Sequence, residues 1–198
     1  MAALLKWKWS FGFSIWLLAI PFCVYSANQS DLGKLQQMTT PQTKPLDLSG
    51  VDLRRFEFVA DKINLKNANL SRTNLSGVDL MGVDLTGADL SYANLSHAKL
   101  NEANLTRADL NHANLDGADL SQANLSSASL NYAILTNAIL QQANLTQVDF
   151  SCANLDQADL TRSNFSESNI SGATFINTIT TGIVHYHSVV DKQVKCDE

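Results

Sequence analysis

Apolar residues recur at every fifth position through the middle of the chain. From Leu65 to Phe175, each fifth residue is Leu, Ile or Phe without exception. Two positions before each of these stands a small or modest residue, such as Ala68, Thr73 or Val78. Asn or Asp usually lies between the two, and the other positions are mostly polar. A helix repeats its apolar residues about every 3.6 positions and a strand every two, so this spacing fits neither.

A spacing of five predicts a chain that turns a corner every five residues. The large and the small apolar residues then point inward, and the other three point outward. Four such sides close a square coil of twenty residues, and like positions stack at the strand separation of about 4.8 Å. The narrow interior requires one small inward residue, because protein cores are close-packed. Asn, Asp, Ser and Gly are expected at the corners. No proline follows Pro45, which preserves the backbone donors between coils.

The pattern resembles the pentapeptide repeat family, whose units read Ala-Asn/Asp-Leu-x-x, as in Ala103-Asn104-Leu105. The resemblance covers residues 63–177 in one register. It implies an all-β fold, a right-handed quadrilateral β-helix (a pentapeptide-repeat solenoid) of about six coils. Caps are expected at the N- and C-terminal ends, because the end coils of a solenoid expose unpaired edges.

The ends of the repeat are less regular than its middle. The whole β-helix is predicted over 46–177, with 46–62 as an irregular first coil. Within it Leu48, Leu53 and Phe58 keep the spacing of five in a different phase, and the register slips near 60–62. Residues 28–62 would cap one end and 178–198 the other. A final strand is expected from the apolar residues Ile183, Val184, Tyr186, Val189 and Val190.

The first residues read as a targeting segment. Lys6 and Lys8 precede an apolar stretch, and small residues near Ser26 offer a cleavage site. The stretch is shorter than the roughly 20 residues that a spanning helix needs, so 1–26 is predicted to be a signal peptide. An uncleaved membrane anchor is the alternative. Residues 27–45 would form a short helix and a linker. The expected location is the periplasm, the thylakoid lumen or the cell exterior.

Two surface features are candidate partner contacts. Twenty-residue stacking places Tyr92, His112 and Tyr132 in one outward row, which is either a recognition stripe or side-chain stacking that stabilises the rod. Ile134 and Ile139 stand where the repeat has Asn or Asp. With Tyr132 they would form a small apolar patch that contacts a partner or a second copy of the chain. Sequence drift in a tolerant repeat is the alternative.

The charge argues against a nucleic-acid-binding protein. The formal net charge is −5, and residues 63–177 carry eleven acidic against five basic side chains. Some relatives in the pentapeptide repeat family are DNA mimics that shield DNA gyrase. An acidic mimic that inhibits or protects a nucleic-acid enzyme such as gyrase is therefore the alternative function. The predicted signal peptide argues against it.

Nothing in the sequence indicates catalysis. No nucleophile and base stand out from the repeat, and a core filled with leucine leaves no room for a ligand pocket. No cofactor or metal is expected, since the histidines at 185 and 187 lack further ligands. Cys152 and Cys196 either pair or remain free thiols.

The leading hypothesis is a non-catalytic structural or protein-binding module outside the cytosol. Its expected partner is an unidentified macromolecule, a protein rather than a nucleic acid, and the chain could also form a homodimer. A membrane would be contacted only through the N-terminal segment, if that segment stays uncleaved.

Overall fold

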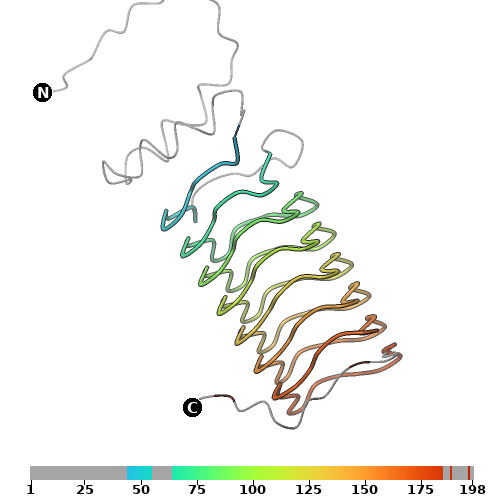
Figure 1. The fold of residues 1–198 in the computed structure, drawn as a ribbon. Coiled ribbons are helices and arrows are strands. Elements are labelled where there is room, and N and C mark those ends of the chain that lie inside the picture. Colours follow the sequence, from blue (N-terminus) through green and yellow to red (C-terminus); the bar gives the residue numbers. More distant parts are fainter. Residues whose placement is uncertain (1–43, 55–63, 185–187, 189–195, 197–198) are drawn as a thin grey trace, which may run out of the picture.

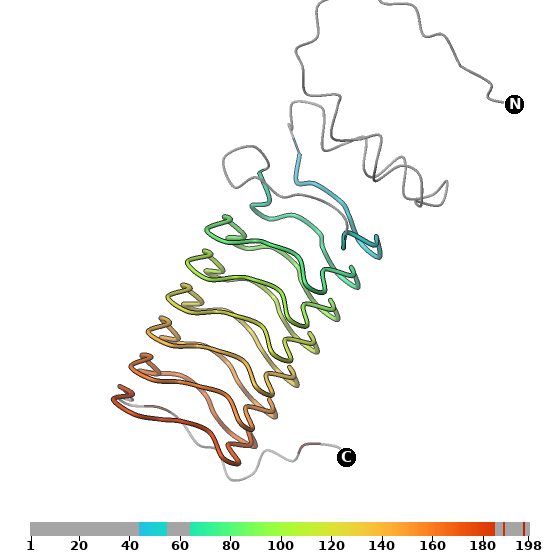
Figure 2. The ribbon, with the colours of Figure 1, turned by 180° about the vertical axis from the view of Figure 1, so that it is seen from behind.

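The described chain winds into one stack of coils. The computed structural model describes residues 44–54 and 64–184, together with residues 188 and 196. Successive turns follow one another along a single axis (Figure 1), and the view from behind in Figure 2 shows the same stack. The predicted signal peptide, the helix within 27–45, Phe58 and the slip near 60–62 lie outside the described residues.

Parallel bridges between single residues join each coil to the next. Asn69 pairs with Asp89, and Asp89 pairs in turn with Asp109, twenty residues further on. The same step continues to the pairing of Asn164 with Val184. These bridges confirm the predicted coil of twenty residues.

The part of the chain that the structure describes contains no helix and no continuous strand, only these bridges. A corner interrupts each side after one bridging residue, so longer strands cannot form. None of its segments is a helix long and apolar enough to cross a membrane.

Each corner is a tight turn with one residue in the left-handed region. At a representative corner the Ala93 amide donates to the Leu90 carbonyl over 3.0 Å, and Tyr92 has a φ of 58°. A positive φ at this position is the mark of a type II turn. Glycine occupies the same position in several units, for example Gly82 with a φ of 66°.

The expectation that Asn and Asp occupy the corners is wrong. These residues sit at the bridge in the middle of each side, and the two residues after each leucine form the turn. Their side chains still stabilise the corner, because the carboxylate or amide oxygen accepts from the backbone two residues on. The Ser91 amide donates to Asp89 Oδ1 over 3.0 Å, and the Thr106 amide donates to Asn104 Oδ1 over 3.2 Å. Asn and Asp therefore stabilise the turn through their side chains, although their backbones lie at the bridge.

The inward assignment of the large and small residues holds along the rod. Leu105 and Ala113 are fully buried, and Phe165 is 2% exposed. Ile170 and Phe175 are only partly buried, although they pack against the same core. They belong to the last described coil, where fewer neighbouring coils cover them. The inward positions thus form one continuous core that thins at its C-terminal end.

The N-terminal coil joins the stack with an offset. Asp47 pairs with Asn69 and Asp52 with Asn74, each over a separation of twenty-two residues rather than twenty. Leu48 and Leu53 are nevertheless buried, at 0% and 1% exposed. The two additional residues fall between Leu53 and Asn69, which accounts for the change of phase in the sequence.

A substitution at Gly82 is expected to isolate the cost of the corner backbone. Nothing lies within 4 Å of a Cβ built there, so a side chain would fit. The left-handed conformation alone should make Gly82→Val cost about 1–2 kcal/mol in the free energy of unfolding. Met81→Val is the matched control, because the neighbouring residue is 52% exposed. Denaturant unfolding that shows equal losses for the two variants would contradict this view of the corner.

Candidate functional site

One corner of the rod carries a continuous stack of rings at its surface. The Tyr92 and His112 rings lie 4.6 Å apart with planes 7° from parallel, and those of His112 and Tyr132 lie 5.1 Å apart at the same angle. The guanidinium of Arg72 sits 4.7 Å from the centroid of Tyr92. The twenty-residue coil produces the stack, since it places the four side chains at one corner position. We call Arg72, Tyr92, His112 and Tyr132 the corner stack.

The rings of the corner stack present their edges to solvent rather than their faces. Each face between Arg72 and Tyr132 is covered by a neighbour in the stack. Tyr92 remains 50% exposed. A ligand that binds by lying flat on an aromatic ring would have to break the stack. The geometry therefore favours the stabilising role over a recognition stripe.

His112→Ala is expected to remove two ring contacts from the corner stack. Cross-strand contacts of this kind contribute about 0.2–1 kcal/mol each, so the thermal midpoint should fall measurably. His97→Ala is the control, because His97 has the same corner backbone, with a φ of 56° against 58° at His112. Its neighbours along that corner are Gly77 and Gly117, which offer no ring. Equal changes in thermal midpoint would show that stacking at His112 contributes nothing.

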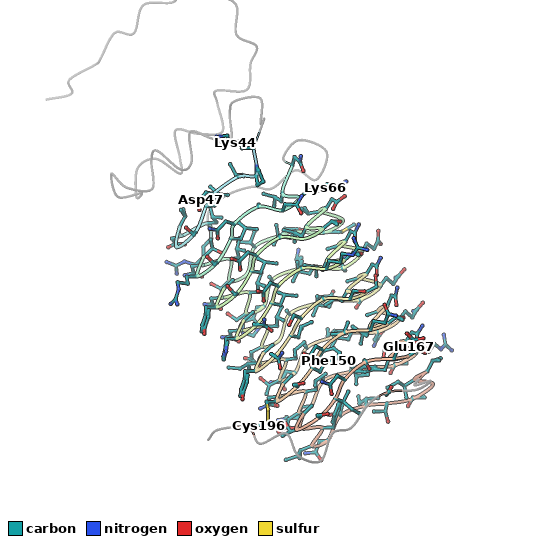
Figure 3. The ribbon with its side chains drawn as sticks, viewed as in Figure 1. Lys44, Asp47, Lys66, Phe150, Glu167 and Cys196 are labelled. Carbon is teal, nitrogen blue, oxygen red and sulfur yellow. A yellow bond between two sulfur atoms is a disulfide. The ribbon has the colours of Figure 1, made fainter. Side chains whose placement is uncertain are left out.

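A disulfide continues the same corner toward the C-terminal end. Cys152 is bonded to Cys196, with Cα atoms 5.5 Å apart, and Figure 3 places Cys196 at that end of the rod. Gly172, the next residue along the corner, leaves room for it: an added Cβ would collide with the Cys196 sulfur. The Cys196 sulfur also lies 3.6 Å from the Gly172 carbonyl oxygen. Of the two alternatives left open by the sequence, the structure shows pairing.

Two isoleucines interrupt the polar outer surface beside the corner stack. Ile134 is 44% exposed and Ile139 is 38% exposed. They lie on adjoining sides of one coil, with a corner between them, and Tyr132 occupies the corner before Ile134. The coils on either side place Asn114 and Asn154 next to Ile134. We call Ile134 and Ile139 the isoleucine patch.

Carboxylates border Ile139 and the corner between the two isoleucines, and hydrogen bonds lower the pKa of two of them. Thr136 donates to Asp116 over 2.5 Å, and with a second bond from Asn137 this lowers the pKa of the Asp116 carboxyl. The Thr161 hydroxyl lowers the pKa of Asp159, with help from Gln141 at 2.7 Å.

The ion pairs of the described residues all lie between the isoleucine patch and the N-terminal end of the rod. They are Arg54–Asp52 at 2.6 Å, Lys66–Asp84 at 3.0 Å and Lys99–Asp79 at 3.4 Å.

The described residues offer no cluster of side chains for a metal ion. Within them, no group of three or more His, Cys, Asp or Glu side chains could hold a metal ion. Every buried polar side-chain atom of the described part has a hydrogen-bond partner. The histidines at 185 and 187 lie outside the described residues.

Comparison with known proteins identifies the repeat. A family model described as pentapeptide repeats matches eight copies, over residues 63–101, 103–142 and 138–177. A search of curated proteins finds no match.

Several solved structures are similar to this chain. The protein HetL of the cyanobacterium Nostoc sp. strain PCC 7120, involved in the regulation of heterocyst differentiation, is 32% identical. The match covers 71% of this chain and 68% of HetL, with a TM-score of 0.49. QnrB1, a plasmid-mediated fluoroquinolone resistance protein, is 16% identical over 72% of this chain and 91% of its own, with a TM-score of 0.47. A protein from the Arabidopsis thaliana thylakoid lumen is 25% identical over 60% of this chain and 66% of its own, with a TM-score of 0.25.

Proposed function

The chain belongs to the pentapeptide repeat family, and we propose that it is a non-catalytic rod that binds another protein outside the cytosol. The observation that carries this proposal is the isoleucine patch. Ile134 and Ile139 stand exposed where the repeat elsewhere places Asn or Asp. They contribute nothing to the core, because their position in the unit faces outward. Exposed apolar side chains in such a surface are suited to a protein contact.

The disulfide supports the proposed compartment. Disulfides persist in oxidising compartments and are rare in the cytosol, where cellular reductants keep thiols reduced. The Cys152–Cys196 bond therefore agrees with the signal peptide predicted over residues 1–26. It also counts against the acidic DNA mimic, which would have to work on its enzyme in the cytosol.

The finer architecture is part of the same proposal. The rod is right-handed and has about six coils, as the family implies. Residues 28–62 cap its N-terminal end and residues 178–198 its C-terminal end. Ser188 supports the second cap, since its hydroxyl donates to the Phe165 carbonyl over 2.8 Å.

Export is tested on the protein from its own cell. Fractionation followed by mass spectrometry of the intact chain should place the protein outside the cytosol with an N-terminus at Ala27 or Asn28. Crosslinking in that fraction, followed by capture of the rod, should identify the bound protein. An intact segment 1–26 on soluble cytosolic protein would contradict the proposal.

The isoleucine patch should matter for association and not for folding. Replacing Ile134 and Ile139 together with Asn should leave the thermal midpoint nearly unchanged, because both side chains point outward. The same change should reduce capture of the crosslinked protein, since burial of apolar surface contributes about 25 cal/mol per Å². If the double variant unfolds readily, the isoleucines are structural. If capture persists at full strength, the contact lies elsewhere on the rod.

A further inference from the structure

We propose that the isoleucine patch docks a protein segment whose apolar side chains are bordered by lysine or arginine. The inference rests on the proposed function and adds the chemistry of the partner. It follows from the residues that the coil places around Ile134 and Ile139.

The centre of the surface is apolar and spans two sides of one coil. Ile134 and Ile139 are 44% and 38% exposed, and the corner residues Thr136 and Asn137 lie between them. The isoleucines are flanked on the adjacent coils by the smaller residues Asn114, Asn154, Asp119 and Asp159. Neither isoleucine is therefore covered by a larger side chain from the next coil. A partner that covers both must therefore cross one corner of the rod.

Four aspartates frame this centre. Asp119 and Asp159 form the bridges to Ile139 from the preceding and the following coil. Asp116 and Asp156 hold the position of Thr136 in the same two coils. Neighbouring coils are separated by about 4.8 Å, so Asp119 and Asp159 lie beside Ile139, and Asp116 and Asp156 flank the corner between the two isoleucines. We call Asp116, Asp119, Asp156 and Asp159 the acidic frame.

No basic side chain of the described residues forms an ion pair with the acidic frame. The three ion pairs of the described part involve residues from Asp52 to Lys99 only. Arg162 lies at the next corner, and its side chain approaches Gly182. Hydrogen bonds instead orient the frame: Thr136 donates to Asp116, and Gln141 donates to Asp159. Among the described residues, His97 beside Asp116 is the one cationic neighbour that lowers the pKa of a carboxyl of the frame. The frame therefore keeps an excess of negative charge that a basic partner can balance.

Charge complementarity decides which partner fits. Opposite charges around an interface steer encounter and fix its register, whereas like charges in contact are costly. A second copy of the chain docked by the same patch would bring one acidic frame against another. Nucleic acid would bring phosphates against it. A cationic segment with an apolar side satisfies both the isoleucines and the frame.

The test uses two synthetic helical peptides that share a leucine face. One carries lysines along both borders of that face and the other carries glutamates. Titrated against the full exported chain at low salt, the lysine peptide should bind and the glutamate peptide should not. Raised salt should weaken binding, since exposed charges are screened.

Matched variants locate the binding site. Asp119→Asn with Asp159→Asn should weaken binding of the lysine peptide about two- to thirtyfold, as loss of two exposed ion pairs predicts. Asp89→Asn with Asp109→Asn is the control: it removes equal charge from the same repeat position on another side of the rod. That control should change affinity less than about twofold. Ile134→Asn with Ile139→Asn should remove most of the binding.

Each other outcome overturns the inference in a distinguishable way. Equal binding of the two peptides would show that the frame does not select charge. Equal losses in the two aspartate variants would show attraction to the rod as a whole. Self-association of the chain that is lost in the isoleucine variant would identify a second copy as the occupant. Failure of the peptides alongside continued crosslinking through the isoleucine patch would refute the cationic partner and leave the proposed function standing.

Discussion

Ala113→Leu is expected to destabilise the rod by about 1–3 kcal/mol or more, because it overpacks a narrow core. Ala113 is fully buried, and the same position in the adjacent coils is held by Ala93 and Ala133, each 1% exposed. A leucine there has no free volume on either side along the axis. The rod could accommodate the leucine only if the large inward residues or the backbone moved. Denaturant unfolding and the thermal midpoint would both report the loss.

Two comparisons make the overpacking result specific. Ala113→Val should cost less, since the repeat itself accepts Val148 at an inward position with 1% exposure. Gln142→Ala, at an exposed corner position, should cost under about 0.5 kcal/mol. If Ala113→Leu and Gln142→Ala had equal effects, the inward and outward assignment would be refuted.

Cys196→Ser is expected to cost up to about 4 kcal/mol, as the chain-entropy estimate gives for a loop of this length. The disulfide joins residues 44 apart in sequence, and the loop so closed contains the last described coils. Each coil of a solenoid contacts only its neighbours. Amide hydrogen exchange should therefore accelerate over residues 153–184 and remain slow over residues 84–130.

The disulfide prediction has an internal control. Cys152→Ser and the double variant should match Cys196→Ser, because any of the three changes removes the same bond. Treatment of the unaltered chain with a dithiol reductant should reproduce their exchange pattern. Unchanged protection near Phe165 and Phe175 in all of these would show that the bond does not stabilise the C-terminal end.

The partner proposal and the stability predictions concern different positions of the repeat. Inward residues such as Ala113 determine whether the rod forms, and outward residues such as Ile139 are free to vary without cost to the core. This separation is why a chain of nearly identical units can carry a specific surface. Under the proposed function, the few outward residues that depart from the pattern provide the specific contact.

The sequence alone determined the coil. Each five-residue unit carries a large inward residue, a small inward residue and a turn, so every unit specifies its own geometry locally. The recurrence from Leu65 to Phe175 therefore predicted the twenty-residue stacking, the row of Tyr92, His112 and Tyr132, and the outward position of Ile134.

Only the tertiary structure decided the features that depend on contacts outside the repeat. Cys196 lies four residues out of the twenty-residue register with Cys152, so the spacing could not predict their bond. The sequence also could not show that Asn and Asp lie at the bridges rather than in the turns. Asn and Asp are favoured equally when they lie in a turn and when only their side-chain oxygen accepts from it. Which carboxylates lie without a basic partner depends on the reach of Lys66 and Lys99 to acids on neighbouring coils. Ion pairs between coils do not recur regularly along the sequence, so only the folded structure shows which charged side chains meet.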